Sequence, residues 1–338
     1  MTSKFELSSL DALKTKLADL PQVDNAASEA ARTRQDSLTK PPGALGRLEE
    51  LAIFMAGWQR AEKPVIDRAQ ALVFAGNHGV CAQGVNPFPQ EVTVQMVANF
   101  KAGGAAINQL CRANGADLSV IALELDRPTQ DFTTTAAMVE SDTLKAFNTG
   151  AEAVDKTSKI LILGEMGIGN STVAAALANA VFGGEAIDWV GRGTGSDDEG
   201  VARKVSAVER GVELHKTAQG LQILSSLGGR EQAAICGAIV AARAARIPVI
   251  LDGYICTAAA APLYAVSPNL LDHCLVGHRS VEPGHQKLLA AMDKEPVLDF
   301  DMRLGEGSGA ALALGILRSA LECHNGMATF AEAGVSGG

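Results

Sequence analysis

Short apolar runs alternate with longer helical stretches through most of this 338-residue chain. Each run is rich in leucine or β-branched residues and ends in glycine or a polar residue, whereas stretches such as 92–115 and 171–183 have the composition of helices. Such alternation is typical of a parallel sheet covered by helices on both faces. We therefore expect a doubly wound α/β fold. Its expected strands are residues 71–76, 118–123, 159–164, 186–191, 247–253 and 274–278.

The two ends of the chain are expected to form a small helical domain. Leucines recur at helical spacing between residues 10 and 20, and a charged helix follows through Arg34. An amphipathic helix follows the Pro-Pro-Gly break at 41–43, and an apolar helix is expected from Glu306 to Leu321. The expected division is an α/β domain over 66–300 and a helical domain formed by 1–65 and 301–338.

Charge and cysteine usage narrow the class of protein. The net charge is −9 and lysine and arginine form no cluster, which argues against nucleic acid as a partner because a duplex-binding protein needs a basic face. The six cysteines are scattered without a CxxC pair, which favours reduced thiols. The first ten residues lack the regions of a signal peptide, and no uncharged apolar run is long enough to span a membrane. We expect a cytoplasmic protein without a membrane segment.

Ligands of doubly wound sheets bind where the strands end, so the loops after the expected strands are the place to look for a site. Four of these loops combine glycine with polar side chains. They are FAGNHGV with Asn77 and His78, GEMGIGNST with Glu165, GRGTGSDDEG with Thr194, and LDGY with Asp252. Four such loops at one edge of one sheet favour a binding site over a set of plain turns.

The GEMGIGNST loop has two possible explanations. The run Gly167-Ile168-Gly169-Asn170 leads into a helix, and glycine there lets free backbone N–H groups approach an anion. Alternatively, the segment is a plain strand-to-helix turn in which Ser171 or Thr172 caps the helix. The spacing matches neither GxGxxG nor a P-loop, so neither of these nucleotide motifs is present.

Charged and metal-ligating residues give two weaker signals. Lys204 could point its ammonium at a phosphate near this loop, or it could be a solvated helix lysine that pairs with Glu199 or Glu209. His278 and His285 are seven positions apart without an obvious third ligand, so we expect no metal site.

Glu306 lies between Gly305 and Gly307 ahead of an apolar helix. One interpretation is a carboxylate at a helix N-terminus that compensates the helix dipole. The other is a carboxylate held in a dry pocket, where burial would raise its pKa into the range of a general base near neutral pH. The residues alone favour the first interpretation.

Nine segments taken together resemble one known family, namely SLTKPPGALGRLEELA, FAGNHGV, PQEVTVQMVANF, GEMGIGNST, VGRGTG, PVILDGY, GHRSVEPGH, LDFDMRLGEGSGAA and MATFAEAGVS. From Ser37 to Ser336 the chain resembles the nicotinate-nucleotide–dimethylbenzimidazole phosphoribosyltransferases. The resemblance implies transfer of phosphoribose from nicotinate mononucleotide to 5,6-dimethylbenzimidazole, which yields nicotinate and α-ribazole 5′-phosphate for the lower ligand of cobalamin. It also implies a Rossmann-like fold with a small helical domain, a homodimer and no cofactor.

The resemblance also implies roles for individual residues. Glu306 matches the family's general base, and Glu165 matches the glutamate beside the ribose. The phosphate would be held by Gly167, Ile168, Gly169, Asn170 and Lys204, and the nicotinate end would lie near Gly193, Thr194, Gly195 and Ser280. The aromatic-base pocket would have Phe88, Met96, Met166 and Leu304 as its walls, which could also favour another benzimidazole or a purine.

Two alternatives to this activity stay open. A ribosyl hydrolase could use the same loops to transfer the phosphoribosyl group to water. A non-catalytic sensor could bind nicotinate nucleotides, although the joint presence of Glu165, Lys204 and Glu306 argues against it, because a sensor needs no base.

Overall fold

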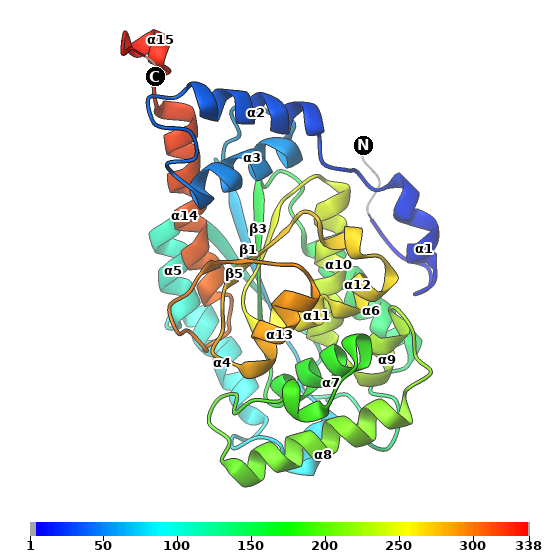
Figure 1. Cartoon of the computed structure of the whole chain (residues 1–338). Helices are drawn as coiled ribbons and strands as arrows, with labels where there is room; N and C mark the ends of the chain where they lie inside the picture. Colours follow the sequence, from blue (N-terminus) through cyan, green and yellow to red (C-terminus); the bar gives the residue numbers. More distant parts are fainter. Residues whose placement is uncertain (1–4, 337–338) are drawn as a thin grey trace.

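The computed structural model describes residues 5–336 and is built around a six-stranded parallel sheet (Figure 1). Residues 1–4, part of the segment considered for a signal peptide, lie outside the described residues. The strands are β1 (Ala69–Ala75), β2 (Ala116–Ala122), β3 (Ile160–Met166), β4 (Val249–Leu251), β5 (Cys274–His278) and β6 (Pro296–Leu298). Their order across the sheet is β2-β1-β3-β4-β5-β6. The order reverses between β1 and β3, and this is the point where doubly wound folds bind ligands.

The helices alternate with the strands along the chain, as expected. They are α1 (Ala12–Lys16), α2 (Asn25–Ser37), α3 (Arg47–Gln59), α4 (Glu91–Ala102), α5 (Ala106–Asn114), α6 (Glu140–Ala153), α7 (Asn170–Phe182), α8 (Asp198–Leu214), α9 (Gln222–Leu227), α10 (Arg230–Ala244), α11 (Tyr254–Ala259), α12 (Ala261–Val266), α13 (Pro283–Ala291), α14 (Ser308–Gly326) and α15 (Phe330–Ala333).

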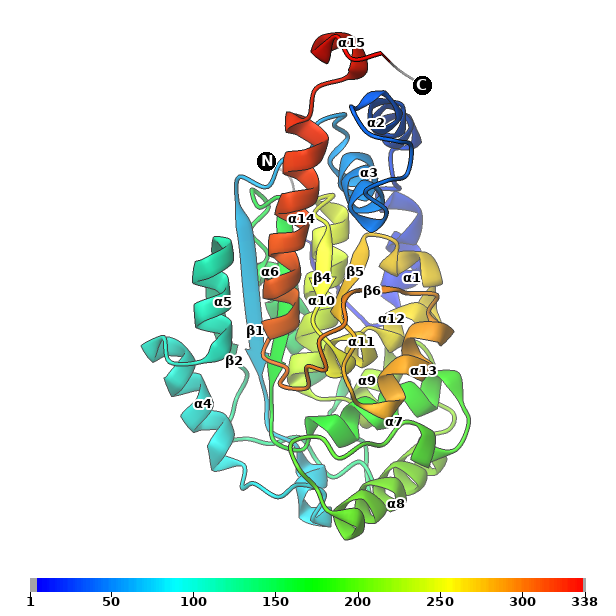
Figure 2. The same cartoon turned by 60° about the vertical axis from the view of Figure 1, so that its left-hand side comes forward.

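Both faces of the sheet are covered, which confirms the predicted α/β architecture. Successive side chains of β1 point to opposite faces, so Val73 packs with α3, α5 and α14, whereas Phe74 packs with α6 and α10. Figure 2 shows α14 running alongside the sheet, on the side where α5 also lies. Within the described part of the chain, no helix is both long and apolar enough to cross a membrane.

One strand prediction is wrong, and one strand was not predicted. The segment 186–191 is not a strand but a short 3₁₀ helix (Ala186–Asp188) followed by a loop. Its Trp189 is buried and donates an indole hydrogen bond to the carbonyl of Gly183 at 2.8 Å, so the segment folds back on the end of α7. The strand β6 was missed because it has three residues and begins at Pro296, which lacks an N–H and suits the first position of an edge strand.

The helices at the chain ends differ in detail from the prediction. The leucine-rich segment 10–20 forms only α1 and a 3₁₀ turn, and the stretch 92–115 is two helices separated at Gly103, which has φ of 81°. The C-terminal helix begins at Ser308, so Glu306 lies outside it.

The two chain ends nevertheless lie together. Leu38 forms an antiparallel bridge with Thr329, and α3 packs on α14. The guanidinium of Arg34 donates hydrogen bonds to three carbonyls at and beyond the end of α14. Because α14 also packs on the sheet, the division into two domains stays a prediction.

Candidate active site

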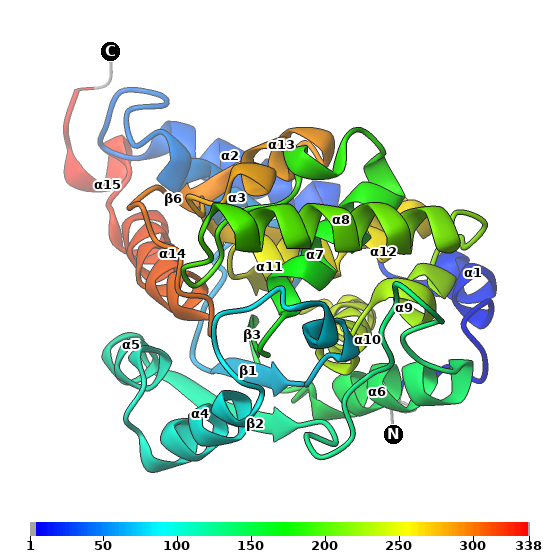
Figure 3. The ribbon, with the colours of Figure 1, turned by 90° about the horizontal axis from the view of Figure 1, so that it is seen from below.

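A cavity of about 240 Å³ lies at the carboxyl ends of the strands, beside the reversal of strand order. Residues from α4, α7 and α8 also line it, and Figure 3 views the molecule from the end where these helices lie. The proposed site residues in its wall are Phe88, Met96, Glu165, Met166, Gly167, Ile168, Gly169, Asn170, Gly193, Thr194, Lys204, Ser280, Leu304 and Glu306. Gly195 belongs to the same turn as Gly193 and Thr194 without lining the cavity. Tertiary folding thus brings residues from six segments of the chain to one place.

The turn between β3 and α7 has no room for a side chain at Gly167. A Cβ there would lie 2.5 Å from the carbonyl oxygen of Gly76 on the adjoining strand end. Gly169, with φ of +92°, is the N-cap of α7, and no side chain caps this helix. The predicted cap by Ser171 or Thr172 is therefore wrong. The uncapped N-terminus of α7 faces the cavity, and this is a favourable position for an anion.

Lys204 is buried, so its interpretation as a solvated lysine paired with Glu199 or Glu209 is wrong. Its Nζ lies 3.2 Å from Oγ of Ser171 and 3.2 Å from the carbonyl oxygen of Gly191. Burial lowers the pKa of this ammonium, and the nearby Glu282 carboxylate opposes the change. The ammonium adds a positive charge beside the first turn of α7. A phosphate bound there would be stabilised by this charge and by the N-terminal end of the helix dipole.

Glu165 is the penultimate residue of β3 and is 5% exposed. One of its carboxylate oxygens accepts a hydrogen bond from the side-chain amide of Asn170. Burial raises the pKa of Glu165 to about 8, and the carboxylates of Asp252 and Glu231 add to the rise. A carboxyl that holds its proton near neutral pH can donate a hydrogen bond to a sugar hydroxyl.

Glu306 has a left-handed backbone conformation, with φ of 64°, and is 7% exposed. Its Oε2 has no hydrogen-bond partner among the residues described. Burial raises the pKa of Glu306 to about 7, and the charge of Asp252 acts in the same direction. The helix-dipole interpretation is wrong, because Asp252 accepts hydrogen bonds from the first turn of α14 in its place. The carboxylate of Glu306 is therefore free to take a proton from a bound molecule.

Apolar side chains form the remaining wall of the cavity. Phe88 and Leu304 are 46% and 53% exposed, and Met96 and Met166 are half-buried. This wall offers a flat aromatic molecule a place to bind within reach of Glu306.

Several lining residues were missed by the sequence argument. Glu282 accepts a hydrogen bond from the N–H of Gly193 at 3.0 Å, which links the loop after β5 to the GTG turn. Arg303, Asn86 and Tyr254 also line the cavity. Glu282 precedes Pro283 at the start of a helix, and Arg303 stands in a loop, so neither position carried a local signal of a site.

The two histidines considered as metal ligands are both buried and lie against other residues of the strand-end loops. Nδ1 of His285 accepts a hydrogen bond from the N–H of Ser280 at 2.9 Å, and Nδ1 of His278 lies 3.4 Å from the Asp252 carboxylate. Across residues 5–336, no group of three or more histidine, cysteine, aspartate or glutamate side chains is arranged to hold a metal ion.

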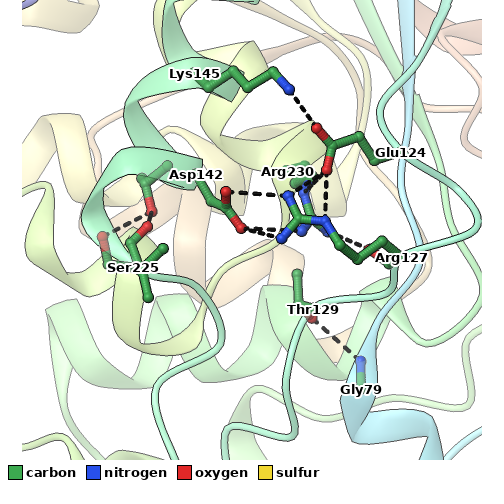
Figure 4. A network of polar contacts seen from close by, with 10 residues as sticks. Gly79, Glu124, Arg127, Thr129, Asp142, Lys145, Ser225 and Arg230 are labelled. Carbon is green, nitrogen blue, oxygen red and sulfur yellow. Dashed lines mark hydrogen bonds and ion pairs between the residues drawn. The ribbon is translucent and has the colours of Figure 1, made fainter.

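An ion network near the end of β2 connects the loop after that strand with α6 and α10 (Figure 4). Its members are Glu124, Arg127, Asp142, Lys145 and Arg230. Arg127 binds Asp142 at 2.7 Å, and Thr129 accepts a hydrogen bond from the N–H of Gly79, which joins the loops after β2 and β1. Arg230 starts α10, and the next residue, Glu231, lies 2.8 Å from the buried His78. The network therefore holds loops in place and does not itself line the cavity.

Comparisons with known proteins agree over almost the whole chain. The DBI_PRT family model, described as a phosphoribosyltransferase, matches residues 20–335. The nicotinate-nucleotide–dimethylbenzimidazole phosphoribosyltransferase of Rhodobacter capsulatus is 63% identical over 98% of this chain and 99% of that protein. The protein of the same name from Ruegeria pomeroyi is 60% identical, with the same shares of both chains covered.

A solved structure shows the same fold. The crystal structure of CobT from Thermus thermophilus matches with a TM-score of 0.87 at 41% identity, covering 93% of this chain and 100% of that one. Together with the sequence matches, it confirms the resemblance seen in the nine segments. The chain belongs to the nicotinate-nucleotide–dimethylbenzimidazole phosphoribosyltransferase family.

Proposed function

We propose that the protein transfers the phosphoribosyl group of nicotinate mononucleotide to 5,6-dimethylbenzimidazole, with Glu306 as the general base. The products are α-ribazole 5′-phosphate, the nucleotide of the cobalamin lower ligand, and nicotinate. The observation that carries the proposal is a buried Glu306 carboxylate, with one oxygen unpartnered within the described chain, in the same cavity as an uncapped helix N-terminus. The names of the relatives from Rhodobacter and Ruegeria support the choice of substrates.

The cavity wall suggests where each part of the substrates binds. The phosphate lies at the start of α7, within reach of the Gly167–Asn170 turn and Lys204. The ribose lies at Glu165, and the nicotinate ring points toward the Gly193–Gly195 turn and Ser280. The benzimidazole lies against the apolar wall, which comprises Phe88, Met96, Met166 and Leu304.

The reaction follows from this arrangement. Nicotinate is a good leaving group, because the charged pyridinium becomes neutral when the bond to the anomeric carbon breaks and its electron pair passes to the ring nitrogen. One benzimidazole nitrogen attacks that carbon from the opposite face, which inverts β to α. The proton on the second benzimidazole nitrogen becomes acidic and passes to the carboxylate of Glu306. The remaining residues hold phosphate and ribose fixed while the base approaches.

Product analysis tests this activity against the two alternatives. The protein is incubated with nicotinate mononucleotide, with and without dimethylbenzimidazole, and released nicotinate and sugar phosphates are separated and quantified. We expect nicotinate and α-ribazole 5′-phosphate only when the base is present. Free ribose phosphate without the base would identify a hydrolase, and no release under either condition would identify a sensor. A series of benzimidazoles and purines would then define the preferred base.

We also propose that the protein is a homodimer in the cytoplasm. The cytoplasm is supported by the six cysteines, none of which is in a disulfide. The N-terminal helices are one candidate contact, and the exposed side chains of Val94 and of Phe300 are two further apolar candidates. Light scattering after size exclusion measures the mass of the particle and would contradict the dimer if it gave that of one chain.

A further inference from the structure

The helix that follows Glu306 has no cap of its own. Gly307 occupies the N-cap position of α14 with φ of 88°, and no side chain from its own segment accepts a hydrogen bond there. The acceptors come from Asp252, which follows β4 and is 1% exposed. Its Oδ2 accepts from the N–H of Gly307 at 3.0 Å, and its Oδ1 accepts from the N–H of Ala310 at 3.0 Å. A carboxylate at this position stabilises a helix start through hydrogen bonds and charge.

The Glu306 segment also lies directly on β3. A Cβ at Gly164 would be 2.5 Å from the carbonyl oxygen of Glu306 and 2.6 Å from the nitrogen of Gly307. A Cβ at Gly305 would be 2.5 Å from a carboxylate oxygen of Glu165. Glu306 itself has the left-handed conformation that non-glycine residues rarely adopt, which persists only where the surroundings hold it. The hydrogen bonds from Asp252 hold the C-terminal side of this segment.

Asp252 is in turn held by packing. The ring of His278 lies beside it, with Nδ1 3.4 Å from Oδ1, and both side chains are 1% exposed. The ring fills the space between two glycines, since a Cβ at Gly253 would be 2.5 Å from Cε1 of His278 and a Cβ at Gly309 would be 2.0 Å from Nδ1. The carboxylate therefore has a fixed direction when it meets the N–H groups of α14.

We propose that Asp252 is a positioning residue for the reaction, which directs the Glu306 carboxylate into the cavity by capping α14 from the neighbouring strand. The proposal rests on the proposed role of Glu306 as the general base. Asp252 also lines the cavity, and the proposed action runs through the backbone N–H groups of Gly307 and Ala310 that donate to its carboxylate.

The charges around Glu306 allow a test that distinguishes an effect of Asp252 on Glu306 from an effect of Asp252 on the stability of the fold alone. The charged and titratable groups that line the same cavity are Glu165 from β3, Asp252 after β4, Tyr254 from α11, His278 from β5, Lys204 from α8, and Glu282 and Arg303 from loops. Of these, Asp252 bonds the backbone next to Glu306, and its negative charge raises the pKa of Glu306. Removing that charge should make Glu306 easier to ionise, whereas a change of fold stability alone would leave the pH dependence unmoved.

The test is the Asp252→Asn variant, which keeps the size of the side chain but loses its charge and one of its two acceptors. We expect kcat to fall about 10²-fold, the loss typical of a misplaced reacting group. Binding of nicotinate mononucleotide, measured by calorimetry, should change little. The acid limb of the kcat/KM profile should move to lower pH. Asp252→Ser, which also retains one neutral acceptor but on a shorter side chain, should show the same movement of the acid limb and at least as large a loss of kcat.

The matched control is Asp24→Asn, because Asp24 caps α2 through the N–H of Ala27 at 3.0 Å and does not line the cavity. It should leave both kcat and the pH profile unchanged. An unmoved acid limb in Asp252→Asn, with or without a lower Tm, would overturn the proposal, as would failure of both Asp252 variants to fold. Glu306→Gln serves as the reference variant. If Glu306→Gln is fully active, Glu306 is not the general base and the proposed function fails. If Glu306→Gln is inactive and Asp252→Asn behaves like the wild type, only the inference about Asp252 fails.

Discussion

Glu165 and Glu306 are two of the buried carboxyls in the cavity, and their surroundings differ. Glu165 accepts a hydrogen bond from Asn170 and has a pKa raised to about 8, first by burial and then by neighbouring carboxylates. Glu306 leaves one oxygen unpartnered within the described chain and has a pKa raised to about 7. This difference suits Glu306 to proton removal and Glu165 to binding a hydroxyl.

Replacing Glu306 with glutamine should remove the base and keep the shape of the cavity. We expect kcat to fall by about 10²–10⁴-fold, the usual contribution of such a proton transfer, while both substrates still bind. In the wild-type protein, kcat/KM should rise with pH through about 7, because the base must be ionised, and this limb should vanish in the variant. Nicotinate release measured from acidic to alkaline pH gives both results. Turnover near the wild-type rate would remove Glu306 from the mechanism.

Replacing Lys204 with alanine should weaken binding of the nucleotide phosphate. Loss of a hydrogen bond to a charged group costs about 1.5–3 kcal/mol, so the KM for nicotinate mononucleotide should rise about tenfold to a hundredfold. The KM for the aromatic base should stay close to that of the wild type. The neighbouring Arg203→Ala is the control, because Arg203 is exposed on the same helix and binds the carbonyl of Gly84. An effect confined to the aromatic base would contradict the phosphate role.

At the scale of elements, the β3–α7 unit places both Glu165, the carboxyl proposed to bind the ribose, and the turn proposed to bind the phosphate. Its geometry depends on close approach between backbones, since Gly167 lies against the carbonyl of Gly76 at the end of β1. The same sequence signals that end the strand and start the helix also produce the turn, so the element was predictable locally. The position of Lys204 beside the N-terminus of α7 was not predictable locally, because Lys204 reaches this point from α8.

The substitution Gly167→Ala should displace this turn. The added methyl would lie 2.5 Å from a backbone carbonyl that belongs to the sheet and cannot move aside cheaply. We expect stability to fall by about 1–3 kcal/mol from overpacking and kcat/KM to fall about 10²-fold from misplacement of the turn. Thermal unfolding and steady-state kinetics measure the two effects. Gly326→Ala, where a Cβ meets nothing within 4 Å, should change neither, and a fully active Gly167→Ala would show that the turn tolerates displacement.

At the scale of the whole molecule, ionisation of the buried carboxyls of the site lowers the free energy of unfolding as the pH rises. The pKa values of Glu165 and Glu306 rise from 4.5 to about 8 and about 7, so the folded protein binds protons that the unfolded chain has released. Their contribution to stability is fully present below pH 4.5 and is lost as the pH rises through 7 to 8. The loss is at most about 1.4 kcal/mol for each pH unit that separates the folded pKa from the unfolded one.

The effect of Glu306 ionisation on stability can be measured by comparing the wild-type protein with the Glu306→Gln variant. The buried His273 and His285, whose pKa values are lowered to about 3, act in the opposite direction, so the wild-type curve alone is a sum of both effects. The ligand-free Glu306→Gln variant should have the same Tm as the wild type at pH 4.5 and a higher Tm at pH 8.5, because it lacks the group that ionises unfavourably. Equal Tm values at both pH values would show that Glu306 is not buried in the way the structure has it.

The alternation of apolar runs and helices was enough to predict the parallel sheet and the edge where its loops meet. The segment 186–191 misled because six residues, of which four are apolar, show no period that separates a strand from a buried turn. Its Trp189 bonds to the end of α7 instead of packing in the sheet. The short β6 gave no signal of its own.

By itself, the sequence determined the α/β class, most of the elements, the site loops and, through the resemblance, the family. Only the tertiary structure decided that Lys204 is buried, that Asp252 caps α14, and that Glu306 is left with a carboxylate oxygen free of partners within the described chain. The physical reason is range. Periodicity and turn chemistry act between residues a few positions apart, whereas Asp252 and Gly307 are 55 positions apart, and protonation depends on every buried charge nearby. The glycine-flanked glutamate looked like a helix cap because its true environment is built by other strands.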